Sequence, residues 1–110
     1  MKRRQFLLGT ILSRGLFSET RGFDVEIMEV FAVSGGGSAL LVHHGDTASR
    51  AEFARWLHVH NRSEVRCQLP HGRTVRGQIF RLKMCFGRGL LLTGERVDVQ
   101  PKGKIRIEIE

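Results

Sequence analysis

Three consecutive glycines between two apolar runs are the feature that most restricts how this chain can fold. The run Val30-Phe31-Ala32-Val33 leads into Ser34-Gly35-Gly36-Gly37-Ser38, and a second apolar run, Ala39 to Val42, leaves it. Glycine adopts positive φ without steric cost, so this segment predicts a tight reversal between two antiparallel strands. We therefore expect a chain built from β-hairpins.

Period-2 alternation of apolar and polar residues predicts strands along much of the chain. One strand begins at Phe23 and runs to the glycines, one spans Val65 to Leu69, and the last spans Lys104 to Ile109. In this last strand the isoleucines are expected to face inward. Leu69-Pro70-His71-Gly72 predicts a turn, because proline presets φ and glycine completes the reversal.

The strand that follows this turn is expected to present four apolar side chains to the core. These are Phe80, Leu82, Met84 and Phe86, with Ile79, Arg81, Lys83 and Cys85 on the opposite side. Gly77 is interpreted as a β-bulge. A further short strand is predicted from Leu90 to Leu92.

One helix is predicted, within residues 46–64. Ser49 is placed to cap it and Glu52 follows at capping-box spacing. Phe53, Trp56, Leu57 and His60 recur at helical intervals, and Asn61 is the expected stop.

The chain of 110 residues is long enough for one domain and its core. Short strands separated by turns favour a mainly β fold, a small antiparallel β-barrel with one inserted α-helix. We assign residues 23–110 to this barrel and residues 1–22 to a basic N-terminal arm.

The first residues allow two interpretations. Lys2-Arg3-Arg4-Gln5-Phe6-Leu7-Leu8 is similar to the start of a twin-arginine export signal. Its apolar run is short, however, and no small-x-small cleavage site precedes Phe23. We favour an arm that docks on a partner in a cytoplasmic protein, with export as the alternative. No segment is apolar for the roughly 20 residues needed to span a bilayer.

Positive charge is concentrated in two segments. The net charge is +7, and residues 62–88 carry seven Lys and Arg against Glu64 alone, while the arm is also basic. Arg66, Arg81 and Lys83 are expected to share one outward face. Arginine forks suit phosphate groups, so the segment is a candidate RNA-binding surface, although no aromatic side chain clearly falls on it for base stacking. Its residues are Arg66, Arg73, Arg76, Arg81, Lys83 and Arg88.

Other chemistry is weakly indicated. Cys67 and Cys85 fall on predicted strands and are expected to be buried free thiols rather than a disulfide. The five histidines and two cysteines match no standard zinc spacing, so no metal or cofactor is expected. No Ser or Cys nucleophile has a histidine base at motif spacing, and we expect no enzyme activity.

In this order the motifs resemble the second, β-barrel domain of translational GTPases of the elongation factor Tu type. The similarity covers about residues 23–107. It is carried by Glu29-Val30-Phe31-Ala32-Val33 with its glycine turn, by Gly77-Gln78-Ile79-Phe80-Arg81 and by Gly89-Leu90-Leu91-Leu92-Thr93-Gly94.

The resemblance implies a barrel that holds the aminoacyl end of tRNA or contacts the ribosome. It places Glu29 and Phe31 at the lip of the pocket for that end. Thr93 stands where the family commonly has arginine, and the chain has no Gly-x-x-x-x-Gly-Lys-Ser/Thr phosphate loop, so the resemblance implies no GTPase activity.

The leading functional hypothesis is a non-enzymatic module that binds RNA or a ribonucleoprotein, with a connection to translation. The alternative is a protein-interaction barrel in a larger assembly, with an acidic protein partner. An exposed apolar stripe of Phe53, Trp56 and Leu57 on the helix would be its marker.

Overall fold

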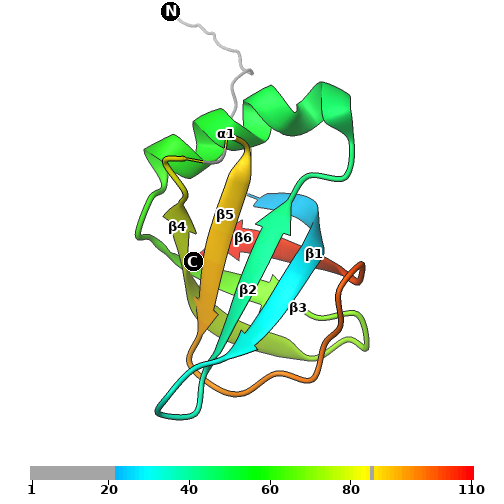
Figure 1. The fold of residues 1–110 in the computed structure, drawn as a ribbon, viewed down its shortest axis with the longest axis vertical. Helices are drawn as coiled ribbons and strands as arrows, with labels where there is room; N and C mark the ends of the chain where they lie inside the picture. The colour runs from blue at the N-terminus through cyan, green and yellow to red at the C-terminus, as the bar shows by residue number, and fades with distance from the viewer. Residues whose placement is uncertain (1–21, 85) are drawn as a thin grey trace, which may run out of the picture.

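Six antiparallel strands close into a barrel in the computed structural model, which describes residues 22–84 and 86–110. The strand order around the barrel is β1-β2-β5-β4-β3-β6 (Figure 1). The strands are β1 (Gly22–Ala32), β2 (Ser38–His43), β3 (Glu64–Gln68), β4 (Thr74–Arg81), β5 (Arg88–Thr93) and β6 (Lys104–Ile109). The predicted fold class, a small antiparallel β-barrel with one helix, is confirmed.

The length of β1 closes the barrel. Its first half pairs with β6 and its second half with β2, from Gly22↔Glu108 to Ala32↔Ser38. The predicted glycine reversal joins β1 to β2, with Gly35 and Gly36 at φ 97° and 104°. The Val33 amide donates to the Gly37 carbonyl at 3.0 Å and ends the hairpin.

Alternate side chains of every strand fill the barrel. Val65 and Cys67 on β3 and Ile105 and Ile107 on β6 are buried, while Arg66 between the former points outward, as the period-2 pattern predicts. The interior is apolar and continuous, and it extends beneath the helix.

The helix α1 (Arg50–Val59) follows a single 3-10 turn at Thr47–Ser49 and lies across one end of the barrel, opposite the glycine hairpin (Figure 1). Asp46, not Ser49, caps this segment: its carboxylate accepts hydrogen bonds from the Ala48 amide and the Ser49 hydroxyl. The hydrogen bond from Ser49 is the main cause that lowers the pKa of Asp46.

The apolar stripe of α1 seals this end of the barrel. Phe53 and Leu57 are fully buried and Trp56 is 6% exposed. Phe23 packs edge-on against Phe53 and Trp56, with ring centroids 5.2 and 5.4 Å apart. The expectation that these helix residues form an exposed partner-binding stripe is therefore wrong, because the open end of a barrel needs an apolar plug.

The predicted orientation of side chains on β4 is also wrong. Ile79 is fully buried and Phe80 only half-buried, whereas Met84 and Phe86 are 94% and 76% exposed. The strand ends at Arg81, so the apolar residues beyond it lie in a loop rather than on the sheet. The outward-facing residues are one position away from those expected, since a slip of one residue exchanges the two faces.

Gly77 is not a bulge. It pairs in register with Val65 and Thr93, and a Cβ there would lie 2.7 Å from the Leu92 carbonyl oxygen. The barrel's register instead shifts on β1, between Ile27 and Glu29. Glycine at position 77 thus permits close approach of two strands.

Cys67 is a buried free thiol, as predicted. Burial, and secondarily the charge of Glu110, raises the pKa of this thiol to about 12. Cys85 and residues 1–21 of the arm predicted at 1–22, with both of its interpretations, lie outside the described residues, while Gly22 is already the first residue of β1. None of the helices in the described ranges is long and apolar enough to cross a membrane.

Candidate nucleic-acid interface

Three of the six residues predicted to bind RNA already have acidic partners. Arg66 contacts Glu108 at 3.1 Å, Arg76 contacts Glu110 at 3.3 Å, and Arg73 forms an ion pair with Glu95. The partners come from β6, from Glu110 directly after it and from the segment after β5, which the topology places beside these arginines. Formal positive charge on the β3–β4 hairpin is therefore largely neutralised within the barrel.

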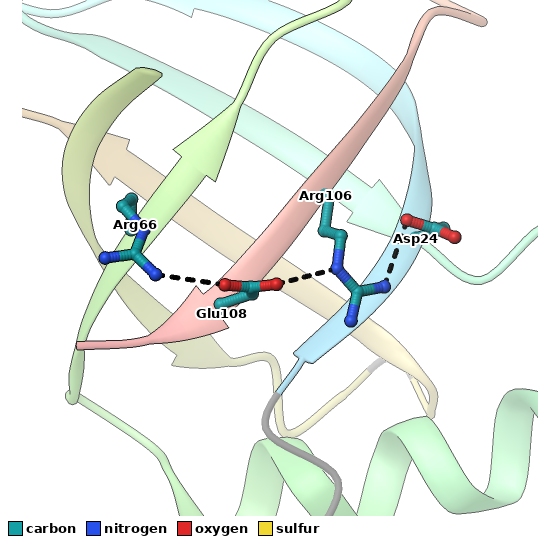
Figure 2. Close-up of polar contacts among 4 residues, drawn as sticks. All are labelled: Asp24, Arg66, Arg106 and Glu108. Carbon is teal, nitrogen blue, oxygen red and sulfur yellow. Dashed lines mark hydrogen bonds and ion pairs between the residues drawn. The ribbon is translucent and has the colours of Figure 1, made fainter.

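One of these pairs belongs to a chain of charges across three strands. Arg66, Glu108, Arg106 and Asp24 follow one another from β3 through β6 to β1 (Figure 2). Hydrogen bonds from Arg106 and then Arg66 lower the pKa of Glu108, and those to Glu108 and Asp24 raise the pKa of Arg106. The charged side chains on the outer side of β3, β6 and β1 are therefore held in salt bridges with one another.

Three other cations, Arg55, Arg81 and Lys83, line a groove of about 640 Å³ between α1 and the loop that follows β4. Ala51 and Ala54 leave room on the helix side, and Leu57 and Leu82 form an apolar floor. The groove is lined by Ala51, Ala54, Arg55, Leu57, His58, Arg81, Leu82, Lys83, Phe86 and Gly87.

Arg81 lies at the centre of this groove. It has the same strand parity as the buried Ile79, so it points toward the helix rather than outward with Arg66, contrary to the prediction. Its Nη1 donates to Nδ1 of His58 at 2.6 Å, which requires the neutral ring with its proton on Nε2. The Arg81 Nε is buried and has no hydrogen-bond partner in the described part of the chain.

The groove is positively charged and offers an aromatic surface. Arg55, Arg81 and Lys83 carry permanent charge, and none of the lining residues is acidic. Lys83 makes no ion pair with any residue in the described ranges. Phe86, 76% exposed on the same loop, supplies an accessible ring beside these cations. Cations next to an exposed ring suit phosphate contact combined with base stacking.

The sequence prediction thus locates part of the groove. Of the predicted residues, Arg81 and Lys83 line the groove. Arg88 is exposed at the first position of β5 and does not line the groove. The prediction omits three residues that do line the groove, Arg55, His58 and Phe86. A signal for the first two exists, because Ala51, Ala54, Arg55 and His58 recur at helical spacing opposite the apolar stripe. Phe86 was missed because it was expected on the core side.

The two residues expected at the lip of a family pocket are both exposed. Glu29 and Phe31 lie on the outer side of β1, just before the glycine hairpin, and Phe31 is 49% exposed. Thr93 is buried and pairs with Ser38 at the end of the glycine hairpin: its hydroxyl accepts from the Ser38 amide at 3.1 Å and donates to the Glu95 carbonyl at 2.7 Å. Thr93 therefore fixes the hairpin to β5.

The histidines of the described residues do not gather. His43 contacts Glu26 at 3.0 Å, His44 accepts from the Asp46 amide, and His60 packs on Trp56. Within residues 22–84 and 86–110, no three His, Cys, Asp or Glu side chains are placed to hold a metal ion.

Comparison with protein-family models, with curated proteins and with solved structures gives no match to this chain. The similarity to the elongation factor Tu barrel remains a prediction from sequence motifs, and the function has to be argued from the site itself.

Proposed function

We propose that this protein is a non-enzymatic RNA-binding barrel whose contact site is the groove between α1 and the β4–β5 loop. The observation that carries the proposal is a groove lined by Arg55, Arg81 and Lys83 without a single carboxylate. Elsewhere on the barrel, Arg66, Arg73 and Arg76 each face an acidic partner. A cation that binds a phosphate releases the counterions condensed on the nucleic acid, and a cation held by a carboxylate must first give up that partner.

In this proposal the groove binds phosphates and a base together. Arg55, Arg81 and Lys83 neutralise backbone charge. Phe86 stacks on one base. The basic arm adds affinity that depends on salt but not on RNA sequence.

The biological context is proposed on the motif resemblance alone. A barrel similar to that of elongation factor Tu would bind tRNA or ribosomal RNA in the cytoplasm. The alternative, export by a twin-arginine signal, predicts a mature chain that begins near residue 22. N-terminal sequencing of the protein made in its own cell separates the two contexts.

The function is tested by filter binding of the full chain to tRNA and to mixed RNA at two salt concentrations. The double variant Arg81→Gln/Lys83→Gln should lower affinity and reduce the slope of log affinity against log salt by about 1.4 to 1.8. Arg66→Gln/Arg73→Gln removes the same formal charge from the paired face and is the matched control. We expect it to retain most of the affinity.

Melting curves followed by circular dichroism should show that both double variants are folded at the temperature of the binding assay. Equal loss of affinity in the two double variants would mean that net charge alone attracts RNA. Unchanged affinity in Arg81→Gln/Lys83→Gln would exclude the groove as the contact site.

A further inference from the structure

Among the described residues that line the helix groove, His58 alone has a side chain that ordinarily changes charge near neutral pH. It is exposed in the last turn of α1. Arg55, Arg81 and Lys83 line the same groove. A change in the charge of the His58 ring therefore alters the potential that a bound phosphate experiences.

A hydrogen bond to Arg81 fixes the protonation state of the His58 ring in the free protein. Nη1 of Arg81 donates to Nδ1 of His58 at 2.6 Å, and a guanidinium group can only donate. Nδ1 must therefore carry a lone pair, which leaves the ring neutral. Protonation of Nδ1 breaks this hydrogen bond and brings two positive charges into contact.

No carboxylate of the described residues lines the groove beside His58. On its own helix the nearest charged residue is Arg55, one turn earlier, whereas the single acid of α1, Glu52, lies six residues before His58 and about a third of a turn away around the axis. β4, which packs against α1, contributes Arg81, and the loop beyond it contributes Lys83. The described groove thus contains no group that stabilises a charged ring.

A phosphate group supplies the negative charge that the groove lacks. One of its oxygens accepts a hydrogen bond from Nδ1–H of the charged His58 ring, and another accepts from the guanidinium of Arg81. Two charge-assisted hydrogen bonds then replace the single one that protonation breaks. Because the ring takes its proton from solvent, binding of the phosphate is coupled to proton uptake.

Given that the groove binds RNA as proposed above, we propose that His58 is a further phosphate-binding residue and that it binds in its protonated form. At higher pH, Arg55, Arg81 and Lys83 contact the RNA backbone without it. At lower pH the charged ring adds a phosphate contact. The affinity of the groove for RNA therefore rises as pH falls through the range in which histidine titrates.

The test is fluorescence anisotropy of the full chain with labelled oligouridylate, whose bases do not titrate in this range. From about pH 8 to about pH 5.5, affinity should rise roughly three- to tenfold, and the slope of log affinity against log salt should steepen by about 0.7, the value for one more contact to a single strand. His58→Gln keeps an acceptor for Arg81 but cannot be protonated, so both changes should be lost. His71→Gln, an exposed change in the turn between β3 and β4, is the matched control and should retain them.

Calorimetry in two buffers with different heats of ionisation counts the protons taken up on binding. The wild type and His71→Gln should take up more protons than His58→Gln, and melting curves should show that these exposed changes leave the fold intact. Equal pH dependence and proton uptake in His58→Gln and the wild type would overturn this role of His58 while leaving the groove as the RNA site. Oligouridylate binding that Arg81→Gln/Lys83→Gln leaves unchanged at the higher pH would overturn both proposals.

Discussion

The arginines of the β3–β4 hairpin and the cations of the helix groove carry similar formal charge, but the hairpin arginines are held by acidic partners, whereas the groove cations form no ion pair with any described residue. Arg66, Arg73 and Arg76 each meet a glutamate. Arg55, Arg81 and Lys83 share a groove with no carboxylate in its lining. The number of Lys and Arg in a stretch of sequence therefore overestimates the charge that the β3–β4 hairpin offers to a ligand and underestimates the charge that the groove offers.

The difference arises from which element each region faces. β6 lies next to β3 in the barrel and presents Glu108 outward, directly opposite Arg66 in the ladder. The groove is formed by α1 and the β4–β5 loop, and neither supplies an acid to its lining. Topology, rather than local composition, decides which cations are neutralised.

The largest effect is expected from removal of the aromatic side chain that packs α1 onto the barrel end, because the groove forms only when the helix is in place. Phe53→Ala empties a fully buried position between the helix and Phe23, and we expect a loss of about 3–5 kcal/mol in the free energy of unfolding. Urea denaturation measures the loss, and Glu52→Ala, exposed on the same helix, is the control. RNA affinity should fall together with the folded fraction; a stable variant would show that the aromatic plug is dispensable.

Phe86→Ala should weaken the groove without affecting the fold. The side chain is 76% exposed, so we expect the melting temperature to be unchanged, and loss of one stacked base should lower RNA affinity about 5- to 100-fold. Met84→Ala is the matched control, because Met84 lies on the same loop, is 94% exposed and has no aromatic ring. If both variants bind RNA equally well, stacking on Phe86 makes no contribution.

Charge can also be restored to the hairpin. Glu95→Gln/Glu108→Gln removes the partners of Arg73 and Arg66, and filter binding should then show RNA affinity increased roughly three- to tenfold, with a steeper dependence on salt. Glu64→Gln/Asp98→Asn makes the same change in net charge at two exposed acidic residues that take part in none of the ion pairs described above. A similar increase in both variants would show that net charge, not release of the arginines, controls binding.

The smallest effect concerns pH. Because Arg106 and Arg66 hold the pKa of Glu108 below its usual value of 4.5, the folded protein binds fewer protons there than the unfolded chain. The stabilisation is present above about pH 4.5 and is lost as pH falls through the lowered pKa. Melting temperatures of wild type and Glu108→Gln should therefore differ at pH 7 and converge in acid, whereas those of Lys83→Gln should parallel the wild type. A difference that persists in acid would contradict the assigned cause.

Much of the fold could be predicted because the signals are local. The glycines of the first hairpin, the turn at Leu69-Pro70-His71-Gly72 and the alternation on β3 and β6 all agree with the barrel. The errors lie where neighbours override local pattern. Met84 and Phe86 read as core residues, but β4 ends at Arg81 and releases them into a loop.

The site was harder to predict because it combines distant segments. Arg81 and Lys83 were identified from charge, yet Arg55 and His58 come from a helix more than 20 residues away in the chain. The strand parity assigned to Arg81 placed it on the wrong face. Only a known register and helix position bring these side chains to one groove.

By itself, the sequence determined the small antiparallel barrel and the position of its helix along the chain, since glycine turns and period-2 alternation act between residues close in the chain. The tertiary structure alone decided which charges and apolar side chains remain available. It pairs Arg66 with Glu108, buries Phe53 beneath the barrel's open end and leaves Leu41 and Leu90 on the surface. Neutralisation and burial depend on neighbours brought together by the closed sheet, and such neighbours are separated by tens of residues along the chain.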